Sequence, residues 1–189
     1  MVNIYKLLGT YFSIVHDEYY DDSKALESYE NVVKEKESYR KDWSSFLSCI
    51  KGSKFPRVVN LEPSSERHCF KASLSFPNNN QGIILCISMI GKLVGIYYDQ
   101  YYRGNNYLPM YNYRGNSENY TLSYYPATAE QEEFSRYTIE TATSIFTSFQ
   151  KFDNFYASKL VENIIVDRTR HEKLDLFQAF FCTNVHGTI

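Results

Sequence analysis

The sequence predicts an α+β fold in which an antiparallel β-meander sheet is flanked by N-terminal and C-terminal helices. Residues 69–98 contain the alternating or fully apolar runs that are typical of strands, separated by turn-forming residues. Apolar residues at helical spacing precede this region, between 26 and 50, and follow it, between 134 and 152. The length of 189 residues suits one domain that spans residues 1–189.

Most of the N-terminal region is predicted to be helical. Residues 3–15 place apolar side chains at helical spacing and indicate a short helix. From Ser23 an apolar stripe continues to Ile50, interrupted by charged residues, so we expect one long helix or two helices joined near residue 38. Gly52 is expected to end this helical region.

Strands are expected next. Residues 57–61 suit a short edge strand, whereas 69–76 alternate apolar and polar residues, which predicts one buried and one wet face. Residues 83–90 are apolar at both odd and even positions, apart from one serine, so both faces of a strand would be buried, as in a central strand. Gly91-Lys92 matches a two-residue type II′ hairpin turn, after which 93–98 returns as the next strand.

The remaining chain alternates between loop, strand and helix. Residues 99–125 are rich in tyrosine and asparagine and suit a long loop or loose hairpin, of which 120–125 returns as a strand. The capping box 128–131 begins a helix whose apolar stripe reaches Phe152. Residues 153–170 have no clear period, and their apolar part fits either a strand or a helical turn. A short helix is expected over 172–181.

Composition argues against several function classes. The net charge is −2 and no lysine- or arginine-rich stripe appears, so nucleic acid is an unlikely general partner. No apolar run approaches the roughly 18 residues of a membrane span, and no membrane partner is expected. The first residues do not resemble a signal peptide, so we expect a cytoplasmic protein whose four widely spaced cysteines stay reduced.

No motif for catalysis, phosphate binding or metal binding is visible, so we predict no catalytic residue, no metal site and no cofactor. The histidines are expected to be ordinary surface or capping residues. Two enzyme-like alternatives stay open. One is a pair formed by Cys69 or Cys86 with His171. The other is a small enzyme or ligand-binding domain with a pocket between sheet and helices, lined by tyrosines and by His68 or His171.

Two segments are candidates for binding a protein partner. The acidic segment 17–30 suits either a solvated helix start or a docking face for a basic partner. The tyrosine- and asparagine-rich segment suits a plain connection, an adaptable recognition loop, or a stacking platform for single-stranded nucleic acid. The predicted contact residues are Asp17, Glu18, Asp21, Asp22, Tyr107, Tyr111, Tyr113 and Arg114.

The segment from Trp43 to Gly52, the meander after it and the ending from Leu174 to Phe181 resemble small bacterial immunity proteins of polymorphic and contact-dependent toxin systems. The resemblance lies in the overall style of the chain and assigns no functional residue. It implies a non-enzymatic inhibitor that binds and neutralises a cognate toxin domain. A nuclease with a positively charged substrate groove would be one toxin class that an acidic face could recognise.

Overall fold

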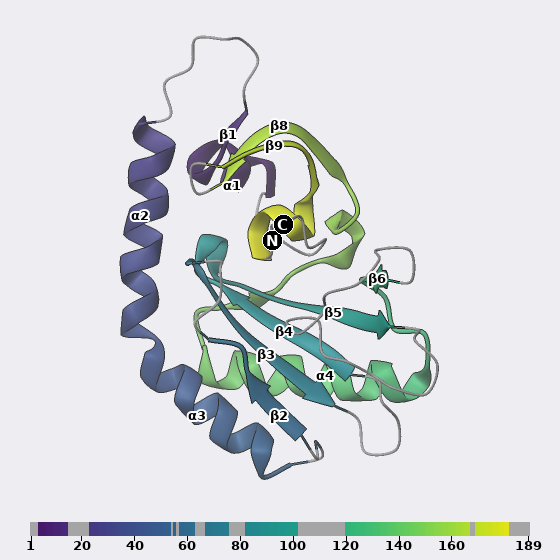
Figure 1. The fold of residues 1–189 in the computed structure, drawn as a ribbon. Helices are drawn as coiled ribbons and strands as arrows, with labels where there is room; N and C mark the ends of the chain where they lie inside the picture. Colours follow the sequence, from purple (N-terminus) through teal and green to yellow (C-terminus); the bar gives the residue numbers. More distant parts are fainter. Residues whose placement is uncertain are drawn as a thin grey trace.

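A central sheet of six strands organises the fold (Figure 1). The computed structural model describes residues 4–14, 23–53, 55, 57–62, 67–75, 82–101, 120–166 and 169–181. Five strands follow the order β2-β3-β4-β5-β6 with antiparallel pairing, and β7 pairs in parallel with β5. Their bounds are β2 (Arg57–Asn60), β3 (Cys69–Ser75), β4 (Gly82–Ser88), β5 (Leu93–Tyr101), β6 (Tyr120–Ser123) and β7 (Gln150–Lys151).

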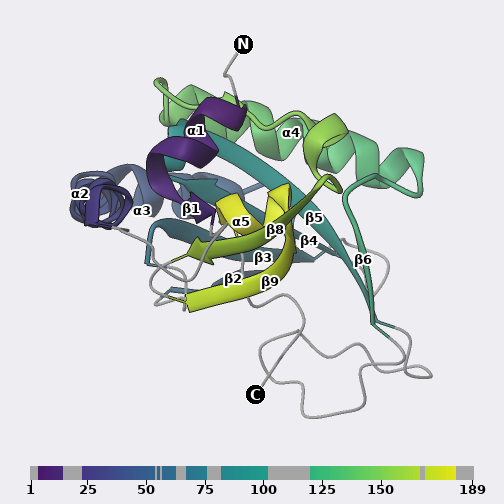
Figure 2. The ribbon, with the colours of Figure 1, turned by 90° about the horizontal axis from the view of Figure 1, so that it is seen from above.

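Helices pack on both faces of this sheet, which confirms the predicted α+β class (Figure 2). One face packs on α3 (Arg40–Lys51) and α4 (Ala129–Ile145). The other packs on α5 (Leu176–Phe181), which also contacts strands β8 and β9 of a small sheet with the order β1-β8-β9. The remaining elements are α1 (Ile4–Tyr11), β1 (Ser13–Ile14), α2 (Ser23–Ser38), η1 (Ile90–Lys92), η4 (Asn154–Tyr156), β8 (Leu160–Val166) and β9 (Thr169–Asp175).

The apolar stripe of the N-terminal helices packs on the sheet as predicted. The helical region is interrupted at Tyr39, between α2 and α3, close to the expected junction at residue 38. Trp43 of α3 stacks on Phe70 of β3, with 5.2 Å between ring centroids and 11° between ring planes. Phe46 and Ile50 are fully buried beside it. This aromatic stack fixes α3 against the sheet.

The prediction of a wet face on β3 is wrong. Lys71 and Ser73, which alternate with the apolar residues of this strand, are both buried. Register places Lys71 on the same side of the sheet as Cys86 and Gly95, and on that side α5 packs on β4 and β5. A Cβ atom placed on Gly95 of β5 would lie 2.7 Å from the Phe181 ring and 2.9 Å from the Phe177 ring. Glycine at this position therefore allows the helix to approach the sheet closely.

The connection between β4 and β5 also differs from the prediction. Ser88 pairs with Leu93, so four residues rather than two make the turn. Gly91 and Lys92 both have positive φ, at 67° and 53°. A type II′ turn has a positive φ only at its first central residue, so the predicted turn type is wrong.

The C-terminal region contains more strand than expected. The ambiguous segment around Val161–Val166 belongs to β8, and residues 172–175, which were expected to begin a helix, belong to β9 (Thr169–Asp175). Only Leu176–Phe181 are helical. The helix predicted to reach Phe152 ends at Ile145, after which the chain turns back along β5 as β7. Among the described residues, no helix has both the length and the apolar character needed to cross a membrane.

Candidate functional site

The predicted partner-binding residues all lie outside the described residues. This applies to the acidic residues Asp17, Glu18, Asp21 and Asp22 and to the loop residues Tyr107, Tyr111, Tyr113 and Arg114. Their roles therefore stay predictions, and the site described below comes from other parts of the chain.

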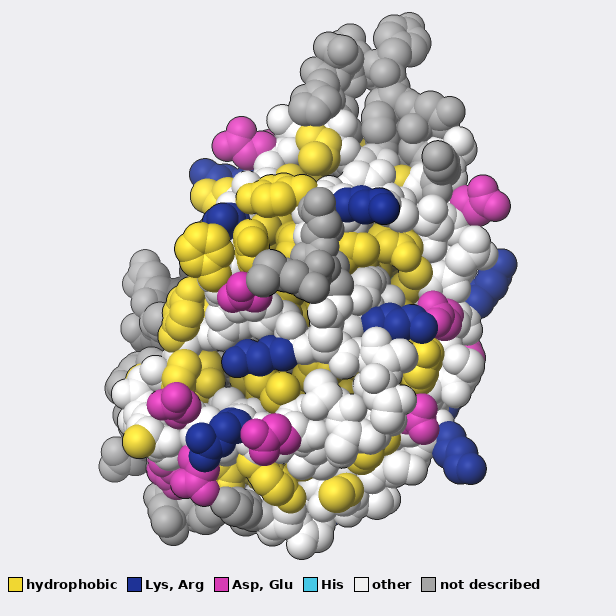
Figure 3. All heavy atoms as spheres, turned by 180° about the vertical axis from the view of Figure 1, so that it is seen from behind, with side chains coloured by type: hydrophobic (Ala, Val, Ile, Leu, Met, Phe, Trp, Pro, Cys, Tyr) yellow, Lys and Arg dark blue, Asp and Glu magenta, His cyan; other side chains and the backbone are white. Residues whose placement is uncertain are grey.

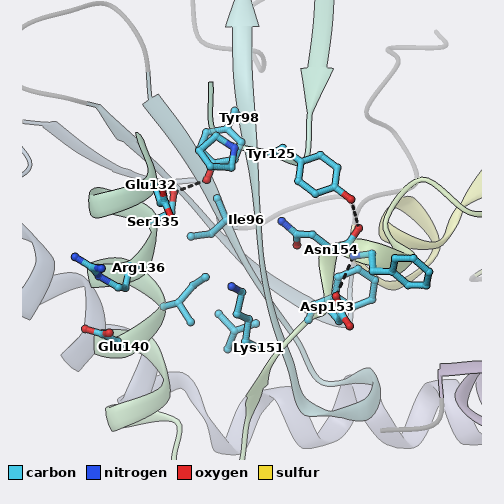
Figure 4. A pocket seen from close by; sticks show the side chains of 15 residues that line it. Ile96, Tyr98, Tyr125, Glu132, Ser135, Arg136, Glu140, Lys151, Asp153 and Asn154 are labelled. Carbon is cyan, nitrogen blue, oxygen red and sulfur yellow. Dashed lines mark hydrogen bonds between the residues drawn. The ribbon is translucent and has the colours of Figure 1, made fainter. Parts of the chain in front are cut away.

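A half-open groove of about 890 Å³ lies between α4 and the edge of the large sheet, and we call it the α4 groove (Figure 4). Its floor is apolar and its rim carries charged and aromatic side chains. The apolar residues are Val94, Ile96, Ile139 and Phe152. A volume of this size lies within the range of about 300–1,000 Å³ that is usual for binding pockets.

The strand pairing explains why the groove is open at this place. β5 pairs with β7 only at Leu93 and Val94, and with β6 only from Tyr98 onward. Residues 95–97 of β5 therefore have no strand partner on this side within the described part of the chain. The opposite wall is one stripe of α4, because 132, 135, 136, 139 and 140 follow helical spacing.

A buried hydroxyl chain lies at one end of the groove. The Tyr98 hydroxyl oxygen is 2.7 Å from Ser135 Oγ, and Ser135 Oγ donates a 2.6 Å hydrogen bond to the backbone carbonyl of Gln131. Because that carbonyl can only accept, the Ser135 proton is committed to it, and Tyr98 donates to Ser135. Burial, with a smaller contribution from the negative charge of Glu132, raises the pKa of Tyr98 above its ordinary value. The phenol therefore keeps its proton.

Charged side chains line the rim on both sides. Glu132, Arg136 and Glu140 come from α4, and Lys151 and Asp153 come from the opposite segment (Figure 4). Asp153 accepts a hydrogen bond from its own turn, at Phe155 N. Arg136 and Lys151 form no ion pair with any of the residues that the structure describes, so both are available to a ligand or partner.

Two aromatic side chains stand exposed beside the groove. Tyr125 is 54% exposed and Phe155 is 64% exposed. The Tyr125 hydroxyl donates to the carbonyl of Asn154, which fixes its ring at the rim. Phe155 packs edge-on against Tyr156 and lies under the Lys159 ammonium, at 4.2 Å from ring centroid to Nζ. The view from the α4 side shows hydrophobic side chains between isolated charges, with no continuous charged surface (Figure 3).

His68 and His171, the histidines within the described ranges, do not line this groove. His68 is fully buried, contrary to the surface or capping role expected. Its Nε2 lies 2.9 Å from the carbonyl oxygen of Phe180, and its Nδ1 lies 2.9 Å from the Tyr29 hydroxyl. His171 lies on β9, where burial lowers its pKa. The groove is lined by two tyrosines, Tyr98 and Tyr125, but by neither His68 nor His171, which were the histidines expected in a tyrosine-lined pocket.

The cysteines that the structure describes are likewise separate from the groove. Cys69 and Cys86 are buried in β3 and β4, as expected for Cys86. Within the described ranges, no three side chains of histidine, cysteine, aspartate or glutamate gather in a way that could hold a metal ion. Sequence reasoning missed most groove residues because they come from three distant segments, 94–98, 125–140 and 151–155. Their charges and spacing form no local motif.

Comparison with known proteins adds no relative. The chain matches no protein-family model, no curated protein and no solved structure. The α4 groove therefore has to be interpreted from its own side chains.

Proposed function

We propose that this chain is a non-enzymatic protein-binding inhibitor, an immunity-type protein that holds a segment of its partner in the α4 groove. The observation that carries the proposal is the pair of exposed aromatic residues, Tyr125 and Phe155, beside an open apolar groove. Aromatic side chains dominate the energetics of protein interfaces because they bury large areas at a low cost in conformational entropy.

The groove suits a partner segment that carries both apolar and charged side chains. Ile96, Ile139 and Phe152 offer an apolar surface, and the rim offers three carboxylates and two cations. A polar rim around an apolar centre is the usual composition of a non-obligate protein interface. The inhibitory role comes from the resemblance to immunity proteins and is part of the proposal.

Direct binding can be tested with a groove variant and a matched control. Tyr125→Ser combined with Phe155→Ser removes the aromatic rim. Ile14→Ser changes an exposed apolar residue on β1, which does not line the groove. A partner captured from the native host by the tagged wild-type chain would be purified and titrated calorimetrically against all three proteins.

We expect the double variant to weaken partner binding at least tenfold, since interface aromatics commonly contribute more than about 1.4 kcal/mol each. The Ile14→Ser variant should bind like the wild type. Equal affinity of the double variant and the wild type would overturn the proposed binding site. Inhibition is tested separately: producing the partner in a host cell should arrest growth, and co-producing this chain should restore it. Absence of rescue would overturn the inhibitory role.

A further inference from the structure

We propose that the Tyr98 end of the α4 groove binds a basic side chain of the protein partner, an arginine or a lysine. This inference rests on the proposed function and names the chemistry that the site recognises. It follows from the direction of the hydrogen bonds, the placement of the charges and the shape of the surrounding side chains.

The hydroxyl chain makes this end of the groove an acceptor site. Both hydroxyl protons point toward the helix, from Tyr98 to Ser135 and from Ser135 to Gln131. The remaining lone pairs of the Tyr98 oxygen can therefore only accept a hydrogen bond from a ligand. Arginine and lysine side chains carry donors and no acceptor, which matches this arrangement.

A carboxylate stands beside the acceptor. Glu132 lies one turn before Ser135 on α4 and lines the same end of the groove (Figure 4). Its negative charge acts on the Tyr98 hydroxyl, which places the two groups in electrostatic range of one another. The Glu132 side chain is exposed and forms no ion pair with the described residues. It is therefore free to pair with a cation from outside.

The neighbouring side chains suit the rest of a basic residue. Ile96 and Ile139 form an apolar surface along which the methylene stem of an arginine or lysine can lie. The exposed ring of Tyr125 offers an aromatic face for a cation. The two cations of the groove, Arg136 and Lys151, lie toward the Glu140 end (Figure 4). The charges along the groove are therefore separated, with the Tyr98 end acidic.

The inference can be tested with blocked amino acids, before any partner is known. N-acetyl-arginine amide is titrated into the ¹⁵N-labelled chain while amide shifts are followed by NMR. N-acetyl-citrulline amide, its neutral isostere, and N-acetyl-glutamate amide are titrated in parallel. We expect blocked arginine to shift the amides of Ile96, Ser135 and Ile139, with millimolar affinity. The citrulline probe should bind at least about fivefold more weakly than the arginine probe, because it cannot form a charge-assisted pair.

Variants locate the effect. Glu132→Gln should weaken arginine binding about fivefold, because it removes the charge and keeps the shape of the side chain. Tyr98→Phe removes the acceptor oxygen and should also weaken it. Glu162→Gln makes the same charge change on β8, at a residue that does not line the groove, and should leave binding unchanged.

Equal binding of arginine and citrulline would overturn the inference, as would the absence of shifts in the groove or tighter binding of the glutamate probe. Such a result would leave the aromatic rim as the proposed partner site. Conversely, a partner that binds the Tyr125→Ser, Phe155→Ser double variant as tightly as the wild type would overturn the proposed binding site even if arginine binds. The two failures can thus be distinguished.

Discussion

Lys36 Nζ lies 2.7 Å from Glu62 Oε2, and each of these side chains is less than a tenth exposed. The same ammonium donates a 2.7 Å hydrogen bond to the carbonyl of Cys69 and lies 4.7 Å from the centroid of the Phe70 ring. Lys36 therefore joins α2 to Glu62, two residues after β2, and to Cys69, the first residue of β3. In the sequence, Lys36 only interrupts an apolar helical stripe.

Breaking this pair on one side should be costly. Lys36→Met leaves the Glu62 carboxylate buried without its cation, and its other oxygen already has no hydrogen-bond partner among the described residues. We expect the free energy of unfolding, measured by urea denaturation, to fall by about 3–5 kcal/mol. Adding Glu62→Leu to the same chain should restore most of that loss. A single variant that costs less than about 1 kcal/mol would contradict a paired, desolvated site.

The close approach of α5 to the sheet predicts opposite effects for two glycine substitutions. Gly95→Ala places a methyl group against the Phe177 and Phe181 rings and should destabilise the fold by about 1–3 kcal/mol. Gly9→Ala, in α1, meets nothing within 4 Å and should stabilise the fold by about 0.5–1 kcal/mol. Thermal or urea unfolding of both variants gives the comparison. Equal effects would mean that the rings move aside without cost.

The start of α4 depends on one side-chain cap. Thr128 Oγ1 accepts a 3.1 Å hydrogen bond from Gln131 N, and Gln131 Oε1 accepts a 2.6 Å bond from Ala127 N. Thr128→Ala should lower the free energy of unfolding by about 1 kcal/mol. Thr128→Ser should retain most of the stabilisation from the cap, because serine is also a good N-cap residue. Because α4 forms one wall of the groove, the alanine variant should also increase amide hydrogen exchange near residues 129–132. Unchanged exchange there would show that packing alone holds the helix start.

His171 predicts a dependence of stability on pH. Burial lowers its pKa in the folded chain, so below the ordinary value of 6.5 the unfolded chain binds more protons than the folded one. Above pH 6.5, protonation of His171 does not lower the free energy of unfolding. As the pH falls toward the folded pKa, protonation favours the unfolded chain and the free energy of unfolding decreases. The urea midpoint should drop between pH 7.5 and 5.5, and His171→Gln should reduce the drop. An identical drop in both proteins would assign the effect to other groups.

The acidic face remains a prediction that kinetics can test once a partner is known. Reversing the charge of Asp21 and Asp22 to lysine should lower the association rate with a basic partner about tenfold at low salt, and less at high salt. The dissociation rate should change little. If both rates stay the same at every salt concentration, the acidic segment takes no part in binding.

The local patterns predicted the meander well. The apolar run that became β4, the helical stripe of α3 and the capping box of α4 each carry their signal within a few residues. The spacing of apolar residues in each segment indicates whether a helix or a strand would bury them on one face, so local sequence is enough to predict the secondary structure there. Residues 172–175 of β9 were wrongly expected to be helical, because their strand conformation depends on pairing with β8 and no local signal expresses that pairing.

The sequence by itself determined the α+β class, the antiparallel meander from β3 to β5, the positions of α2 and α3 and the start of α4. Only the tertiary structure decided that Lys71 and Ser73 are buried, because their side of the sheet also carries α5, a helix about a hundred residues later in the chain. It also decided the α4 groove. The groove opens where residues 95–97 of β5 have no described strand partner beside them, and its hydroxyl chain joins Tyr98 of β5 to Ser135 of α4. Contacts between segments that are distant in the sequence produce no local periodic pattern. They therefore become visible only when the packed structure is known.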